Sequence, residues 1–221
     1  NIAIGFNAMT TNTAGGEYNV AVGNYALDAL TSGDENVAIG HNAMTTETTG
    51  FQNTALGAGA AYSQNDEDYN TAIGYKVLHN GTGSSNTGVG ASALLTNTTG
   101  TKNVAVGTDA LKLNTTASFN TAVGAGALKA ATTGGNNVAI GLDALDSLTT
   151  GADNVAVGRD SLGLLTTGSN NTAVGKFCLK AVTTSADNTA VGFGAGDAIS
   201  TGHSNTVVGK YAGASTVTIT D

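Results

Sequence analysis

The sequence predicts an all-β fold, a parallel β-solenoid of one domain, and three observations carry that prediction. A five-residue motif recurs with small substitutions: Asn, a β-branched residue, Ala, an aliphatic residue and Gly. Its thirteen copies follow one another at steps of 16 to 18 residues, with 17 the commonest. The composition has 32 glycines, no proline, no tryptophan and 5% aromatic residues, so the apolar material is small and suits thin layers. Self-similarity at a short fixed period is typical of solenoids.

The five-residue motif is the predicted strand, because β-branched residues flank a small one and glycine ends the run. Seventeen residues are too few for a packed pair of helices, but they suit one coil of a solenoid. Parallel strands stack about 4.8 Å apart, so thirteen coils give a rod roughly 60 Å long. No linker interrupts the repeats, and residues 1–221 are therefore expected to form one repeat domain.

The second half of the repeat usually begins with an Ala-Leu pair at the eighth and ninth positions, as at Ala110-Leu111. We expect the leucine to plug the core and the alanine to allow close approach. Periodicity over so few residues leaves two conformations open for this leg, an extended segment or a short helical turn. The Thr-Thr-Gly that follows, as at Thr149-Thr150-Gly151, predicts the return turn.

The two faces of the strand predict how the coils associate. The second and fourth positions point one way and the third points the other. Neither face is charged, so one face should close on the interior of the coil and the other should meet another chain. We expect the fourth-position column to be buried (Val123, Ile140, Val157 and Val174 among its members) and the strand column to lie near the axis of a parallel homotrimer.

Two columns of the repeat are predicted to be structural. The asparagines should form a hydrogen-bonded ladder along the rod: Asn1, Asn19, Asn36, Asn53, Asn70, Asn86, Asn103, Asn120, Asn137, Asn154, Asn171, Asn188 and Asn205. The glycines should form corners that need positive φ or close backbone approach: Gly5, Gly23, Gly40, Gly57, Gly74, Gly90, Gly107, Gly124, Gly141, Gly158, Gly175, Gly192 and Gly209.

Catalytic and cofactor sites are not indicated. His41, His79 and His203 lie far apart, in no metal-ligand spacing and with no Ser-His-Asp set. Cys178, the one cysteine, stands in a column otherwise filled by small residues, which favours a buried apolar role over a nucleophile. We therefore expect no enzyme activity and no cofactor.

One irregular repeat offers a weak metal candidate. Asp66, Glu67 and Asp68 replace the usual return turn, and such loops supply the oxygen ligands of calcium. A solvated acidic turn is the favoured alternative.

The charge excludes some partners. The net charge is −8 and Arg159 is the only arginine. The chain therefore lacks the clusters of Lys and Arg side chains that bind nucleic acid or anionic membranes. No apolar run approaches the length of a membrane span. The chain does not begin with methionine, and we expect it to be part of a longer fibre protein. The alternating Thr216, Thr218 and Thr220 suggest a strand leading into whatever caps the rod.

The repeats NVAIG and NTAVG followed by Ala-Leu resemble the head repeats of YadA-type trimeric autotransporter adhesins, and also the repeats of viral tail fibres and surface fibres. The resemblance covers the whole chain. It implies a homotrimer of left-handed β-rolls in an extracellular setting, on a virion or a bacterial surface.

The expected function is a structural or adhesive fibre segment that attaches to a host or matrix, through a glycan or protein receptor. The alternative is an ice-binding solenoid that presents threonine ladders.

Overall fold

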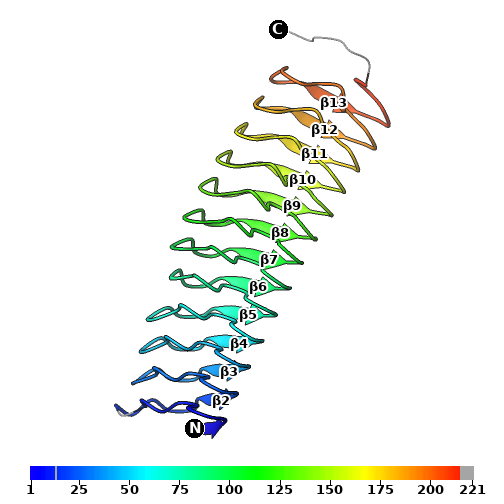
Figure 1. Cartoon of the computed structure of the whole chain (residues 1–221). Coiled ribbons are helices and arrows are strands. Elements are labelled where there is room, and N and C mark those ends of the chain that lie inside the picture. The colour runs from blue at the N-terminus through cyan, green and yellow to red at the C-terminus, as the bar shows by residue number, and fades with distance from the viewer. Residues whose placement is uncertain (13, 215–221) are drawn as a thin grey trace.

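The structure, a computed structural model, describes residues 1–12 and 14–214, and over these residues the chain forms a long stack of coils (Figure 1). Each repeat contributes one three-residue strand, and none of the described residues is helical. The strands are β1 (Ile2–Ile4), β2 (Val20–Val22), β3 (Val37–Ile39), β4 (Thr54–Leu56), β5 (Thr71–Ile73), β6 (Thr87–Val89), β7 (Val104–Val106), β8 (Thr121–Val123), β9 (Val138–Ile140), β10 (Val155–Val157), β11 (Thr172–Val174), β12 (Thr189–Val191) and β13 (Thr206–Val208). Thr216, Thr218 and Thr220 lie outside the described residues.

Each strand pairs in parallel with the strand of the next repeat, so the thirteen described strands form one sheet in chain order. The register is set by the repeat: Ala38 of β3 lies opposite Ala55 of β4, and the same column matches at every step. The parallel β-solenoid predicted from the sequence is confirmed. The first strand and the last lie at opposite ends of the stack (Figure 1).

The interior of the rod is a thin, continuous apolar core. The third-position alanines of the strands meet the Ala-Leu pairs of the second leg, and from the second coil to the eleventh these columns are buried. Ala105, Ala110 and Leu111 of the seventh coil are each 0% exposed. Small residues on one wall and a leucine on the other give an interdigitated layer, which is how a coil of seventeen residues excludes water.

The prediction that the fourth-position column is buried is wrong for the single chain. Val123, Ile140 and Val174 are 37 to 40% exposed, and Val157 is half-buried. The leucine of the second leg already fills the space opposite the strand, so only alanine fits on the inward face. The β-branched second position and the fourth position therefore share the outer face of the sheet.

The second leg is neither a regular strand nor the helical turn that the sequence left open. Its seventh and ninth positions lie in the left-handed region, as at Asp143 (φ 53°) and Leu145 (φ 53°). The position before each asparagine does the same, as at Asp153 (φ 59°). Of the non-glycine residues with positive φ among those described, none is Val, Ile or Thr, although these types are abundant in the chain. Branching at Cβ is strongly disfavoured in this region, which explains the selection.

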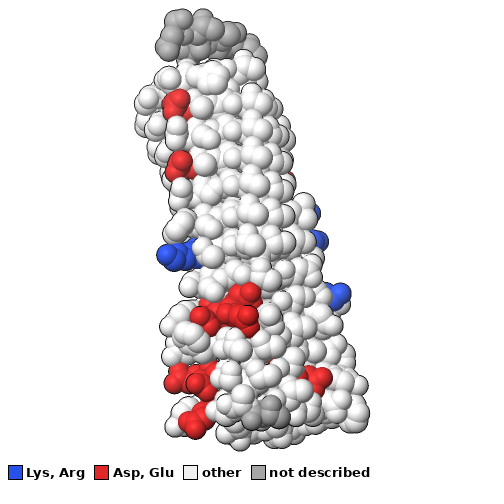
Figure 2. Space-filling model, turned by 90° about the vertical axis from the view of Figure 1, so that its left-hand side faces the viewer, with Lys and Arg blue, Asp and Glu red and all other residues white. Residues whose placement is uncertain are grey.

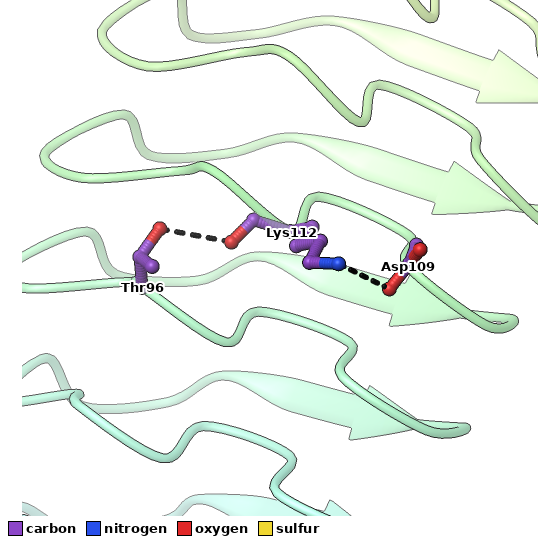
Figure 3. A network of polar contacts seen from close by, with 3 residues as sticks. All are labelled: Thr96, Asp109 and Lys112. Atoms are coloured by element: carbon purple, nitrogen blue, oxygen red, sulfur yellow. Dashed lines mark hydrogen bonds and ion pairs between the residues drawn. The ribbon is translucent and has the colours of Figure 1, made fainter.

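Hydrogen bonds tie this leg to the next coil. The Thr96 hydroxyl donates to the carbonyl of Lys112 at 2.8 Å, and the Lys112 ammonium lies 3.0 Å from Asp109 (Figure 3). The first contact joins two coils, whereas the ion pair is local and partly exposed. A surface ion pair of this kind adds little to stability, so the stacking rests on the backbone and hydroxyl bonds.

Candidate functional site

The asparagine column forms hydrogen bonds from coil to coil. The backbone N–H of Asn137 donates to Oδ1 of Asn120 at 2.8 Å, and its Nδ2 donates to the carbonyl of Gly151 at 3.0 Å. The members of the column from Asn19 to Asn205 are all buried. From Asn19 to Asn188, each Oδ1 thus accepts the backbone N–H of the next asparagine in the column, and most of the side-chain Nδ2 groups donate to the carbonyl of a return turn. The column holds the rod together, and among the described residues only Nδ2 of Asn70 is a buried side-chain atom of this column without a hydrogen-bond partner.

The glycine column holds the corner after each strand. All thirteen members have φ between 119° and 140°. At Gly107 an added Cβ would lie 2.5 Å from the carbonyl oxygen of Gly124 in the next coil. Both the conformation and the backbone contact exclude a side chain, and so these positions serve the fold.

The acidic turn of the fourth coil uses its carboxylates within the protein. Asp66 Oδ1 accepts hydrogen bonds from the Thr48 and Thr49 hydroxyls at 2.8 and 2.7 Å, which lower its pKa. Asp68 Oδ1 accepts from the backbone N–H of Phe51 at 2.9 Å. Within residues 1–12 and 14–214, no group of three or more His, Cys, Asp or Glu side chains could hold a metal ion. Calcium binding at Asp66, Glu67 and Asp68 stays a prediction.

A buried carboxyl group lies directly beneath this turn. Glu47 is 0% exposed, and its Oε1 accepts a hydrogen bond from the Gly50 N–H at 2.8 Å. Burial, reinforced by the nearby charges of Glu67 and Asp66, raises its pKa to about 8. In the next coil Gln64 occupies the same column, also fully buried. The sequence reasoning missed Glu47, although its column is apolar in many other coils.

The threonines of the return turns divide into two rows. In most pairs the first threonine donates its hydroxyl to the next coil, as Thr132 does to the carbonyl of Thr149 at 3.1 Å. The second is exposed: Thr49, Thr99, Thr116, Thr133, Thr150, Thr167, Thr184 and Thr201. Among these exposed threonines, Thr49 donates its hydroxyl to Asp66, so the row along this edge is not uniform.

Charge is unevenly distributed over the surface. On the side of the rod that Figure 2 shows, acidic atoms outnumber basic ones and include one larger patch. Four of the eight cationic residues lie instead among aromatic rings of the last coils, where Lys176 and Lys180 each stand 4.6 Å from the ring centre of Phe177. These contacts are cation–π pairs.

Aromatic rings also gather at the other end of the rod, on the corner that follows each strand. Phe6 and Tyr25 meet edge to face at 5.6 Å, and Tyr25 meets His41 at 6.2 Å. The row is interrupted at Ala58 and resumes at Tyr75. The interruption leaves an open hollow of about 410 Å³, lined by His41, Asn42, Ala58, Gly59, Tyr62, Tyr75, Lys76 and His79.

The structure therefore brings together two of the histidines that the sequence kept apart. His41 and His79 line the same hollow, whereas His203 lies at the far end, where its Nδ1 is 3.1 Å from the Ala186 backbone nitrogen. Cys178 is buried, as its column predicts, and burial raises the pKa of its thiol to about 11. Counting columns would have found the hollow, since small residues at Ala58 and Gly59 stand between larger ones in the neighbouring coils.

No helix among the described residues is long and apolar enough to cross a membrane. Compared with known proteins, the chain matches no family model, no curated protein and no solved structure.

Proposed function

We propose that this chain is a segment of a homotrimeric, non-catalytic surface fibre that attaches a virion or a bacterial cell to a host or matrix. One observation carries the proposal: no other part of residues 1–12 and 14–214 covers the outer face of the sheet. It runs from β1 to β13 and presents two columns of Val, Ile, Leu and Thr side chains that are half-buried or exposed.

The fourth-position column is aliphatic in every coil, and it is the apolar part of this face. Ile39, Leu56 and Ile140 are 38, 43 and 40% exposed, and no charged side chain interrupts the strands. Monomeric proteins seldom expose an apolar surface that is continuous over such a length. In a closed trimer the apolar face of every chain would be covered, and none would remain exposed. An open contact that does not close into a ring would instead keep adding chains.

The oligomer is tested by mass. Native mass spectrometry and light scattering should give three times the chain mass in dilute neutral buffer. Ile140→Asp should reduce the mass to that of one chain while the circular dichroism of the sheet persists, since a charge would enter the interface but not the core. Thr150→Asp, on the exposed threonine row, is the matched control and should remain trimeric. A wild-type mass of one chain with the fold intact would refute the trimer.

Attachment follows from what the trimer leaves exposed. The residues at the corner after each strand vary in size and charge from coil to coil, more than the third and fourth strand positions do. A rod that keeps its shape and varies its surface suits recognition by those variable positions. The fluorescently labelled trimer should adsorb to a subset of bacterial strains or immobilised matrix proteins, and adsorption to none of a broad panel would contradict the proposal.

One observation favours the alternative of ice binding. The outer face is a regular parallel sheet whose second column is threonine in seven coils: Thr54, Thr71, Thr87, Thr121, Thr172, Thr189 and Thr206. The fourth column beside it is aliphatic throughout. The face therefore presents hydroxyl groups in the second column only, mixed there with methyl groups. A thermal-hysteresis assay at micromolar protein decides, because strong activity would require this face to be free in solution and would displace the fibre proposal.

A further inference from the structure

The hollow at Ala58 and Gly59 is a gap one coil wide between larger side chains of the two adjacent coils. His41 precedes the gap and Tyr75 follows it, in the same column of the third and fifth coils. Both are exposed, and the backbone of the fourth coil forms the floor between them. The hydrogen bond from Gly59 N–H to the carbonyl of His41, at 2.9 Å, holds that floor in line with its neighbours.

The width of the gap follows from the stacking. Two strand spacings separate the third and fifth coils, about 9.6 Å. A flat or puckered ring that contacts a wall on each side at about 3.5 to 4.0 Å needs about 7 to 8 Å. The gap therefore accepts one six-membered ring between His41 and Tyr75, and it is too narrow for two.

The walls combine aromatic faces with hydrogen-bonding groups. The rings of Tyr62 and His79 stack at 4.9 Å with planes 28° apart, which fixes them as a rigid side wall. His79 Nδ1 lies 2.8 Å from the carbonyl of Gly59, so this nitrogen donates to the carbonyl and Nε2 is the ring nitrogen left for a ligand. Asn42 supplies a donor and an acceptor, and Lys76 supplies donors. No carboxylate lines the hollow.

We infer that this hollow binds a single pyranose ring of a surface glycan. The C–H faces of such a ring would lie against the aromatic walls, and its hydroxyl groups, which both donate and accept, match the mixed set of polar groups at the rim. The inference rests on the proposed attachment function and names its ligand class. The hollow lies beyond the glycine corner, outside the strand columns that the trimer would cover.

A second gap in the same column provides an internal control. Ala125 and Gly126 of the eighth coil are the counterparts of Ala58 and Gly59. Their neighbours are Asp109 on one side and Asp143 on the other, in place of Asn42 and Lys76. This gap has similar backbone and spacing but acidic walls without aromatic rings, so it should not bind the same ligand.

The test replaces the alanine of each gap by tyrosine, a residue that another coil already has at the same position of the repeat. Ala58→Tyr should fold normally, because Tyr75 stands at the same position one coil away, and should close the hollow. Ala125→Tyr is the matched control. The fluorescent wild-type chain is applied to an array of neutral and acidic bacterial and animal glycans, and free monosaccharides of the bound class are then titrated by NMR.

We expect wild type and Ala125→Tyr to bind the same pyranose-containing probes and Ala58→Tyr to lose the signal. Tyr75→Ala should weaken the affinity by about tenfold through loss of one stacking wall. Equal binding by Ala58→Tyr, or no binding of wild type to any glycan, would overturn the inference. Cell adsorption separates the two proposals: adsorption that Ala58→Tyr leaves unchanged refutes the hollow alone, whereas no adsorption by wild type refutes attachment itself.

Discussion

Two equally buried leucines of the ninth coil allow us to test whether the left-handed backbone conformation excludes β-branched side chains. Leu145 and Leu148 are both 0% exposed and pack in the same core. Leu145 has φ 53°, whereas Leu148 is not among the residues with positive φ. Replacing each in turn by isoleucine keeps the volume and the hydrophobicity and moves one branch point to Cβ. Any difference between the two variants then reports on backbone conformation.

The expected magnitudes differ. A volume-conserving exchange of leucine for isoleucine in a core costs less than about 1.5 kcal/mol after repacking, and Leu148→Ile should stay within that limit. At Leu145 the second branch at Cβ adds strain in the left-handed region, where such residues are outliers and each unfavourable conformation costs roughly 1 to 3 kcal/mol. We therefore expect Leu145→Ile to lower the free energy of unfolding by about 1 to 3 kcal/mol more than Leu148→Ile.

Urea unfolding followed by far-ultraviolet circular dichroism measures this difference. The variants must be compared at one protein concentration, because association shifts the transition. Hydrogen exchange at coils eight to ten shows whether the loss is local, as expected when each repeat contacts only its neighbours. Equal losses for Leu145→Ile and Leu148→Ile would refute the argument that left-handed backbone excludes β-branched residues from these columns.

Three further outcomes are expected. The folded state holds the proton of Glu47 up to about pH 8, whereas the unfolded chain holds it only up to about pH 4.5. The melting temperature should therefore fall as pH rises from about 4.5 to about 8, and Glu47→Gln should remove this dependence of the melting temperature on pH. Gly107→Ala should destabilise by at least about 1 to 3 kcal/mol, since its φ of 138° disfavours a side chain and its Cβ would meet the next coil's backbone. Gly163→Ala, whose Cβ would lie 3.3 Å from the nearest backbone oxygen, should cost clearly less, and comparable melting curves would exclude this account. Asn137→Ala should cost roughly 2 to 4 kcal/mol in urea unfolding, because it strands a buried carbonyl and a buried N–H, and a loss under 1 kcal/mol would contradict that role.

The candidate site was only partly accessible from the sequence. The acidic turn at Asp66, Glu67 and Asp68 is visible as a break in the repeat, but its threonine partners come from the preceding coil. The hollow was missed because its walls, His41 and Tyr75 among them, are separated by a full repeat on each side of Ala58. A small residue forms a gap with two walls only when its coil is stacked between two coils that have larger residues at the same position.

The sequence by itself determined the fold class, the number of strands and the parallel in-register pairing, because a period of 17 residues with one short strand leaves few other ways to bury alanine and leucine. It also placed the asparagine and glycine columns. It did not determine which strand face points inward: alternation marks two faces but assigns neither. The tertiary structure decided this, since the leucine of the second leg fills the interior and leaves room only for alanine, so the larger Val123 and Ile140 face outward. The left-handed conformation of residues in that leg was likewise decided by how the chain must turn to close each coil, because leucine, as at Leu145, has no local preference for it.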